Sequence, residues 1–231
     1  MQQQKLRLIS FDLDDTLYDN KPVILGAFAT LYQHLVQLYP ALAELYSLEG
    51  FIRHSEQFRL DRPDIIDLEQ LRHLQIKSIL EEIGAQDANT ETAYQAFYAA
   101  RQKVQLHPHA TSLLEVLVRK YSLISITNGN ANPENFGLGS YFQLNLNPAN
   151  TGMAKPDPSL YKHACNLMQV KPEQMLHIGN EIDNDYWAAK NAGAHAIWLN
   201  LNQERVAGVT QVGSLQELYE LVNQSSLEDL L

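Results

Sequence analysis

LRLISFDLDDTL, residues 6–17, is the stretch of sequence that decides the fold. Its first half, Leu6 to Phe11, is a short apolar run that contains a β-branched residue, which is typical of a buried strand. Carboxylates follow at once, at Asp12 and Asp14. Because open α/β sheets bind their ligands outside the carboxyl ends of the strands, we expect a functional site at this point.

The pattern changes after this strand. Between residues 21 and 105 apolar residues recur at helical spacing and strand signals are few, which predicts an all-helical block. After Pro108 helices and strands alternate, which predicts a parallel sheet with helices on both faces. The expected elements are helices 111–120, 158–168 and 186–192, and strands 123–127, 175–178 and 194–199. One strand before the helical block predicts an α/β core, residues 1–18 and 107–231, with an inserted α-helical cap, residues 19–106.

Length and composition limit the class of protein. The 231 residues suffice for a core domain and a smaller inserted one. The formal net charge is -10 and we expect no cluster of basic residues that could follow a phosphate backbone, and therefore no nucleic-acid partner. The single cysteine, Cys165, cannot form an internal disulfide, and no apolar run is long enough to span a bilayer. A cytoplasmic protein that does not insert into membranes is therefore expected.

The first motif is the pair of carboxylates at Asp12 and Asp14. Two carboxylates at a strand end can act at one centre, one as nucleophile and metal ligand, the other as general acid and base. Like charges this close raise the pKa of one carboxyl group unless a cation lies between them, and Mg²⁺ prefers such oxygen ligands. An isolated Asp-x-Asp more often caps a turn, so the interpretation depends on the other motifs.

Three further motifs lie at later strand ends and in one loop. The residues they contribute are Thr127, Asn128 and Gly129; Lys155; and Asn180, Glu181 and Asp185. The first group offers hydrogen bonds to phosphoryl oxygens, the lysine can offset phosphoryl charge, and the last group can present oxygens to a metal. Each motif alone reads as an ordinary turn, solvated loop or helix start. In combination they supply the parts of one phosphoryl-transfer site.

The four motifs together resemble those of the haloacid dehalogenase-like (HAD) hydrolase superfamily, and the resemblance covers essentially the whole chain. It implies a phosphatase in which Asp12 attacks phosphorus and becomes an aspartyl-phosphate, while Asp14 protonates the leaving oxygen and later activates water. It also implies that the sheet is a modified Rossmann-like one, and that Thr127, Asn128 and Lys155 bind the transferring group. Mg²⁺ would be held by the Asp12 side chain, the Asp14 backbone carbonyl and the fourth motif.

The fourth motif departs from the family pattern at Asn180, where a carboxylate is usual. An amide oxygen attracts Mg²⁺ less strongly than a carboxylate does. Asn180 could ligate more weakly, Glu181 could replace it, or the site could be poor in metal. We expect the first two jointly, with Asp185 supplying charge and support.

Three alternatives stand beside a phosphatase. One is a dehalogenase, which by the resemblance needs no metal, lacks the second Asp of the first motif and carries Asn in the fourth. Another is a non-catalytic phosphate-binding protein, and the third is a sugar-phosphate mutase. The presence of Asp14 favours the phosphatase.

The expected substrate is a small phosphorylated metabolite. Residues 18–24 and 127–134 resemble a bacterial subgroup that dephosphorylates flavin mononucleotide (FMN) and 5-amino-6-(5-phosphoribitylamino)uracil. One of these two molecules is the specific hypothesis.

Overall fold

A single parallel sheet forms the centre of the α/β part of the chain. A computed structural model describes residues 5–85, 89–202, 206–224 and 227. Within them, six strands pair in the order β3-β2-β1-β4-β5-β6, and every pair is parallel. The strands are β1 (Leu8–Phe11), β2 (Ser122–Ile126), β3 (Asn145–Leu146), β4 (Met175–Gly179), β5 (His195–Leu199) and β6 (Gln211–Val212). The predicted Rossmann-like α/β fold is confirmed.

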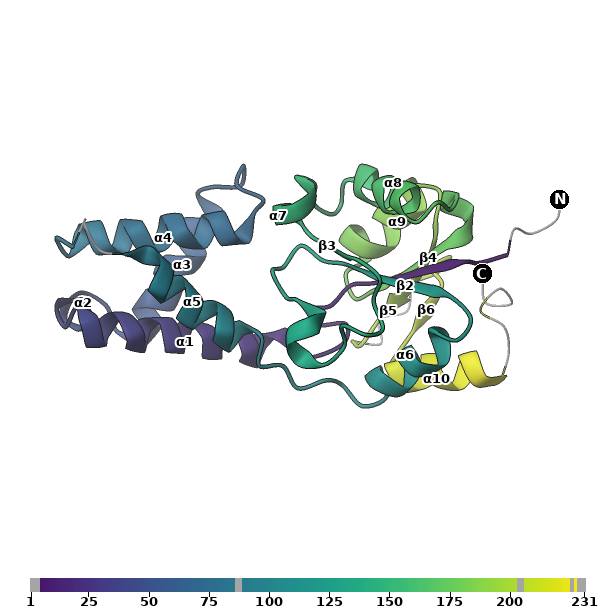
Figure 1. Ribbon diagram of the computed structural model, residues 1–231, viewed down its shortest axis with the longest axis horizontal. Helices are drawn as coiled ribbons and strands as arrows, with labels where there is room; N and C mark the ends of the chain where they lie inside the picture. The colour runs from purple at the N-terminus through teal and green to yellow at the C-terminus, as the bar shows by residue number, and fades with distance from the viewer. Residues whose placement is uncertain (1–4, 86–88, 203–205, 225–226, 228–231) are drawn as a thin grey trace. The chain divides into compact units, whose positions relative to one another are not determined.

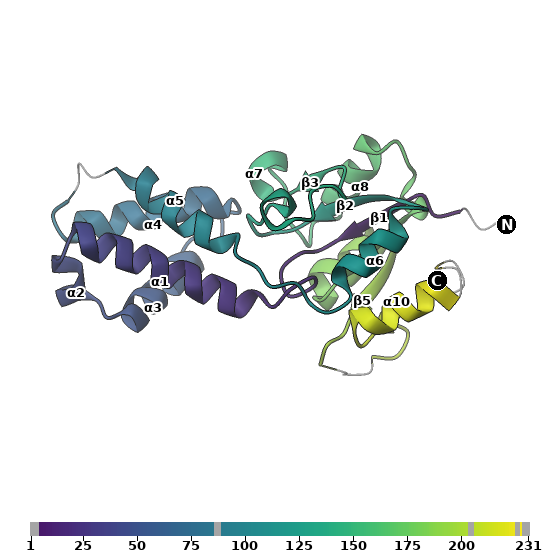
Figure 2. The same ribbon diagram turned by 60° about the horizontal axis from the view of Figure 1, so that its bottom comes forward.

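Helices cover both faces of this sheet. Figure 1 shows α8 (Pro158–Leu167) and α9 (Ala188–Asn191) on one face. In Figure 2, α6 (Ala110–Leu117) and α10 (Leu215–Gln224) lie together on the other face. Every residue of β1 and β4 is buried, because both faces of these central strands are covered. This explains why β1 reads as a continuous apolar run rather than an alternating one.

The connections contain several short elements that the sequence pattern did not predict. They are α7 (Pro148–Thr151), the 3₁₀ turns η1 (Pro133–Phe136) and η2 (Pro172–Gln174), and the π-helical turn η3 (Ile182–Trp187). The turn η3 leads directly into α9, so the helix expected over residues 186–192 begins earlier, with a wider turn. Single π turns within helices occur often at functional sites.

The chain divides into two compact units, residues 1–19 with 105–231 and residues 20–104. The second unit contains α1 (Asn20–Leu38), α2 (Ala41–Leu45), α3 (Leu48–Leu60), α4 (Leu68–Glu82) and α5 (Thr90–Arg101), and no strand among its described residues. Its core includes an edge-to-face pair of rings, Phe28 of α1 and Phe97 of α5, with centroids 5.5 Å apart. No helix in the described part of the chain has the length and apolar character needed to cross a membrane.

The two segments that connect to residues 20–104 run side by side within the α/β unit. Tyr18 and Leu106 form an antiparallel bridge. The backbone N–H of His107 donates to the carbonyl of Leu17 at 2.8 Å. The chain therefore leaves the α/β unit and returns to it at adjacent points.

Candidate active site

The site lies at the carboxyl ends of three neighbouring strands. Asp12 follows β1, Thr127 follows β2 and Asn180 follows β4. Because these strands are parallel and adjacent in the order β2-β1-β4, their carboxyl ends meet at one edge of the sheet. The backbone continues the pairing here, since the Asp12 N–H donates to the Ile178 carbonyl at 2.9 Å. Residues of the first, second and fourth motifs therefore lie at the same edge of the sheet.

A buried lysine joins two carboxylates at this edge. The Lys155 Nζ lies 2.6 Å from Asp12 Oδ1 and 2.6 Å from Asp185 Oδ1. All three residues are almost fully buried, with 6%, 5% and 1% of Lys155, Asp12 and Asp185 exposed. Ions buried this deeply must be paired, and here one ammonium serves two carboxylates. The cluster therefore carries one negative charge in excess when both carboxylates are ionised.

The pKa values follow from that imbalance. Burial raises the pKa of Asp12 to about 7, although Lys155 opposes the shift. Burial alone would lower the pKa of Lys155, but the two carboxylates outweigh it and raise that pKa. For Asp185, burial favours a higher pKa, yet Lys155 and His177 together hold the pKa below its ordinary value. Asp12 is thus the carboxylate whose charge is least compensated.

Residues that the sequence did not single out hold Asp185. The carboxylate can only accept, so His177 donates from Nε2 to Asp185 Oδ1 at 3.1 Å. The other ring nitrogen, Nδ1, accepts from the Ser10 hydroxyl at 2.7 Å. Burial lowers the pKa of His177, which favours the neutral ring. The sequence contains only a weak indication that His177 belongs to the site, because a lone His in an apolar strand is usually a core residue.

Gly179 leaves the space that Asp185 occupies. A Cβ added at Gly179 would lie 2.3 Å from Asp185 Cγ. The other carboxylate oxygen of Asp185, Oδ2, accepts from the Glu181 N–H at 2.9 Å. The glycine of the fourth motif is therefore required by a close approach and not by its backbone angles.

A set of oxygens beside Asp12 fits a metal ion. The site-facing end of the Asn180 amide lies 3.0 Å from Thr16 Oγ1, 3.1 Å from the Asp14 carbonyl oxygen and 3.3 Å from Asp12 Oδ2. With the amide oxygen at this end, the Asn180 oxygen faces two other acceptors, the Asp14 carbonyl oxygen and Asp12 Oδ2. A cation bound between these oxygens would remove their mutual repulsion. Ligand oxygens about 2.1 Å from Mg²⁺ lie about 3 Å apart when adjacent, close to the spacing here. Alternatively, the turned amide donates its N–H to the same oxygens.

Two predicted metal residues are turned elsewhere. The Glu181 side chain is exposed and accepts from the Asn184 side-chain amide, so in this structure it is directed to Asn184, and its role as a ligand in place of Asn180 stays a prediction. Both oxygens of Asp185 accept from Lys155, His177 and the Glu181 backbone, so in this structure Asp185 supports the lysine, and its role as a metal ligand stays a prediction. Among the described residues, no three His, Cys, Asp or Glu side chains gather into a metal-binding group.

The second motif also differs in detail. Asn128 was expected to bind phosphoryl oxygens, but its side-chain oxygen accepts from the Lys155 N–H at 2.8 Å and its amide donates to the Lys155 carbonyl at 2.9 Å. This pair of hydrogen bonds fixes the loop that carries the lysine. The Thr127 hydroxyl oxygen accepts from the Gly129 N–H at 3.0 Å, which leaves its proton available to donate.

Asp14 lies at the same edge in a different setting. It is partly exposed, and the Tyr18 hydroxyl donates to its Oδ1 at 2.5 Å. The next residue, Asp15, has a positive φ of 57°, so the chain turns sharply there. Asp12 and Asp14 thus occupy two environments, one buried against a lysine and one partly exposed to solvent.

The fold and this site define a class that the sequence also matches. The model of the haloacid dehalogenase-like hydrolase family matches residues 6–193, and the chain belongs to that family. Within it, the chain is an enzyme of the phosphatase class, the phosphoric monoester hydrolases, as its curated relatives are.

The relatives span several named activities. The 5-amino-6-(5-phospho-D-ribitylamino)uracil phosphatase YigB of Escherichia coli (strain K12) is 32% identical over 200 residues, covering 84% of each chain. The phosphoserine phosphatase of Thermus thermophilus is 28% identical over 93% of this chain and 98% of its own. Among solved structures, the 2-haloacid dehalogenase from Pseudomonas syringae pv. Tomato DC3000 matches with a TM-score of 0.84 and 29% identity, covering 95% and 99% of the two chains.

Proposed function

We propose that this enzyme is a Mg²⁺-dependent phosphomonoesterase that works through a phosphorylated Asp12. The observation that carries the proposal is the buried Asp12 carboxylate, paired with Lys155 and followed two residues later by the more open Asp14. A buried, under-compensated carboxylate at a strand end is suited to attack an electrophile. A second carboxylate that can exchange protons is suited to general acid and base work.

The reaction has two steps. In the first, an Asp12 oxygen attacks phosphorus, the bond from phosphorus to the ester oxygen breaks, and Asp14 gives its proton to the departing alcohol. In the second, Asp14 takes a proton from water as the water oxygen attacks phosphorus, and the bond from phosphorus to the Asp12 oxygen breaks, which releases phosphate and restores the Asp12 carboxylate. The Tyr18 hydroxyl, which donates to Asp14 Oδ1, holds that carboxylate in place for both proton transfers.

The remaining residues bind and orient the phosphoryl group. The Lys155 ammonium and the Thr127 hydroxyl are donors for its oxygens, and Asn128 fixes the Lys155 backbone. Mg²⁺, when bound by Asp12, the Asp14 carbonyl and Asn180, would offset the charge that builds up on the phosphoryl oxygens. It would also compensate the excess negative charge of the buried cluster.

The activity test is a Mg²⁺ titration with an aryl phosphate, in the wild type and in Asp12→Asn. Turnover should depend on Mg²⁺ in the wild type and fall by at least about 10³-fold in the variant, because the nucleophile is gone. Circular dichroism checks that the variant is folded. Folded wild-type protein with no Mg²⁺-stimulated turnover would mean a phosphate-binding protein without catalysis.

For the substrate we propose FMN or 5-amino-6-(5-phosphoribitylamino)uracil. The support is the relative at 32% identity, which is named for the second of these molecules. Because other relatives are named for phosphoserine and N-acylneuraminate 9-phosphate activities, a panel is the appropriate test. The two flavin-pathway esters should show the highest kcat/KM, and a preference for phosphoserine or a sugar phosphate would refute the assignment.

A dehalogenase is the second candidate, favoured by Asn180 and by the solved structure at 29% identity. A carbon electrophile would need no metal and no second acid. Halide release from a 2-haloacid, measured beside phosphate release in the presence of EDTA, distinguishes the two reactions. Halide release that survives both EDTA and Asp14→Asn would favour the dehalogenase.

A further inference from the structure

A basic hollow lies at the opposite edge of the sheet from the active site. Its volume is about 600 Å³, within the range of small-molecule sites. Its lining residues are Lys5, Leu6, Arg7, Val118, Arg119, Lys120, Tyr121, Ser122, Gln143 and Gln174. Four of them are cations and none is acidic, in a chain whose formal net charge is -10. The hollow is therefore a locally basic surface on an acidic protein.

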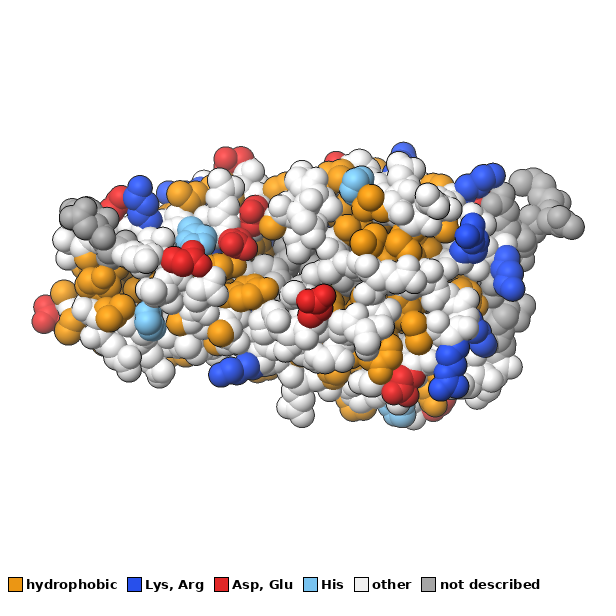
Figure 3. Space-filling view, in the orientation of Figure 1, with side chains coloured by type: hydrophobic (Ala, Val, Ile, Leu, Met, Phe, Trp, Pro, Cys, Tyr) orange, Lys and Arg blue, Asp and Glu red, His pale blue; other side chains and the backbone are white. Residues whose placement is uncertain are grey.

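The fold, and not a run of sequence, assembles the hollow. Arg7 lies just before β1, Ser122 opens β2 and Gln174 lies just before β4. Because the strands are parallel, their amino ends bring two separate basic pairs together, residues 5 and 7 from the start of the chain and residues 119–120 from the end of α6. Figure 3 shows basic side chains gathered at this edge of the α/β unit. The expectation that no basic cluster exists holds along the sequence but not in space.

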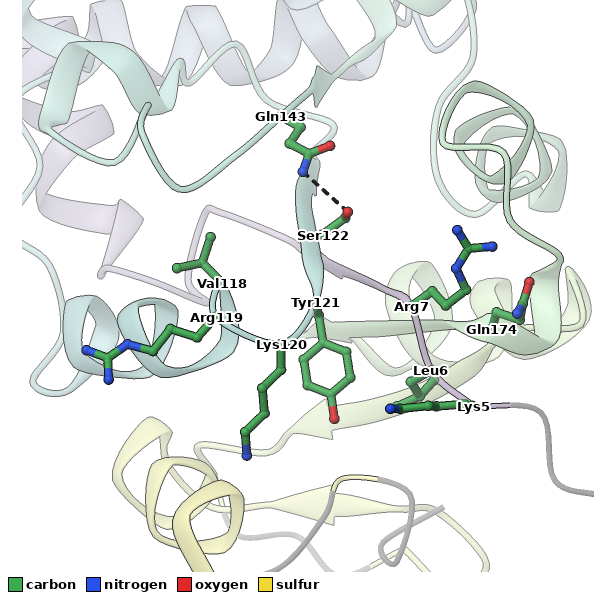
Figure 4. A pocket seen from close by; sticks show the side chains of 10 residues that line it. All are labelled: Lys5, Leu6, Arg7, Val118, Arg119, Lys120, Tyr121, Ser122, Gln143 and Gln174. Carbon is green, nitrogen blue, oxygen red and sulfur yellow. Dashed lines mark hydrogen bonds between the residues drawn. The ribbon is translucent and has the colours of Figure 1, made fainter.

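The side chains offer more than charge. In Figure 4, Lys120, Tyr121 and Lys5 extend toward the same end of the hollow, and Arg7 lies beside Gln174. The Gln143 amide donates to the Ser122 hydroxyl at 3.3 Å, and both side chains line the hollow. Cations beside amide and hydroxyl groups suit phosphate oxygens, which accept several hydrogen bonds each.

We propose that this hollow binds a small polyanion with two or more phosphate groups. Exposed cations bind a single charge weakly in water, so several must act on one ligand that carries several charges. The volume fits a small molecule, and the strongly acidic remainder of the chain disfavours an extended nucleic acid. The ligand is not the substrate of Asp12, because β1 separates the two sites by roughly 15 Å.

The test is calorimetric titration with inorganic tripolyphosphate and, separately, with ATP, in metal-free buffer. One polyanion should bind per chain, and Arg119→Ala/Lys120→Ala should weaken binding at least about tenfold. A matched control, Lys162→Ala/Lys190→Ala, removes two exposed lysines of α8 and α9 and should leave binding unchanged. Affinity should fall as salt rises. Equal affinity for both ligands identifies free polyphosphate as sufficient, whereas tighter ATP binding identifies a nucleotide.

Repeating the titration in Asp12→Asn distinguishes polyanion binding in the hollow from binding at the active site. The loss caused by Arg119→Ala/Lys120→Ala should be the same in that background. Aryl phosphate hydrolysis by the Arg119→Ala/Lys120→Ala protein, measured without polyanion, should match the wild type and reports that it is folded. The proposal is overturned by absence of binding, by equal weakening in the control pair, or by a single-stranded oligonucleotide that binds more tightly than tripolyphosphate.

Discussion

At the scale of single residues, Asn180 is the side chain whose replacement most directly tests the metal site. Asn180→Asp adds a charge next to Asp12 Oδ2 and the Asp14 carbonyl, from which the amide lies 3.3 and 3.1 Å. We expect the Mg²⁺ concentration for half-maximal activity to fall about tenfold or more, because a carboxylate attracts the cation more strongly than an amide. The control is Glu181→Gln, which changes an exposed carboxylate bonded to Asn184 and should leave that concentration unchanged. Equal effects of the two substitutions would contradict the assignment of Asn180.

Gly179 allows a second test at this scale. Gly179→Ala places a methyl group 2.3 Å from Asp185 Cγ, so Asp185 and the buried lysine cluster must move. We expect a loss of about 3 kcal/mol or more in the free energy of unfolding and a large loss of activity. The control is Gly26→Ala in α1, where nothing lies within 4 Å and alanine favours the helix by about 1 kcal/mol. Urea unfolding of both variants measures the contrast, and a Gly179→Ala protein as stable as wild type would show that Asp185 can move freely.

At the scale of elements, the helices were predictable from the helical spacing of their apolar residues, and the central strands from their continuous apolar runs. The predicted helix 158–168 and strand 175–178 match α8 and β4 within a residue. The two-residue strands β3 and β6 are too short to show a period, and they form because a parallel neighbour supplies their hydrogen bonds. Such tertiary pairing leaves no local signal.

For the candidate site too, local sequence patterns indicated some residues, and contacts that depend on the tertiary fold could not be predicted. Asp12, Thr127 and Asn180 could be proposed because they follow apolar strands, and Lys155 because its loop motif completes the set of four. His177 was not found, because its role depends on reaching Asp185 eight residues later and Ser10 on the neighbouring strand. Asn128 was expected to bind phosphoryl oxygens, because the sequence does not show that its side-chain amide forms two hydrogen bonds with the Lys155 backbone. Spacing reveals which edge a residue reaches, whereas hydrogen-bond partners depend on the packed loops.

Strand β5 pairs with β4 and supports the site from there. Its Trp198 is 8% exposed and donates from Nε1 to the Asn180 carbonyl at 2.8 Å. Trp198→Phe keeps much of the ring packing and removes this hydrogen bond, so we expect about 1 kcal/mol of destabilisation and a several-fold weaker response to Mg²⁺. Trp187→Phe, at a side chain 41% exposed, is the matched control and should change neither. Thermal unfolding and Mg²⁺ titration of activity give the two measurements.

At the scale of the whole molecule, the buried ion pair should appear in the pH dependence of stability. The folded-state pKa of Asp185 lies below its ordinary value of 3.8 because Lys155 and His177 favour the charged form. The stabilisation is therefore fully present above about pH 4 and is lost as pH falls further, through the folded-state pKa. Asp185→Asn removes a charge-assisted hydrogen bond and should cost about 2 kcal/mol at pH 7. Urea unfolding at pH 7 and at pH 3 should show a smaller difference between variant and wild type at the lower pH. A difference independent of pH would mean that Asp185 is not ionised in the fold.

The two-unit organisation leads to the last prediction, that the α/β unit can form its site without residues 20–104. All of the site residues identified above belong to the α/β unit. The chain leaves and re-enters that unit at adjacent points, where Tyr18 bridges to Leu106 and His107 donates to Leu17. A short Gly/Ser linker from residue 19 to residue 105 should therefore close without strain, since loop length changes closure free energy only slightly.

Such a protein should fold and hydrolyse a small aryl phosphate in a Mg²⁺-dependent manner. It should discriminate among larger phosphate esters at least about tenfold less than the full chain does, because an inserted cap selects the leaving group in the proposed enzyme. Circular dichroism, kcat/KM for the aryl phosphate and kcat/KM for FMN are the measurements, with Asp12→Asn in the shortened chain as the inactive control. Failure to fold would show that the helical unit contributes to the stability of the sheet. A folded protein with no aryl phosphatase activity would show instead that the chemistry needs a residue from 20–104, which would overturn the assignment of the whole site to the α/β unit.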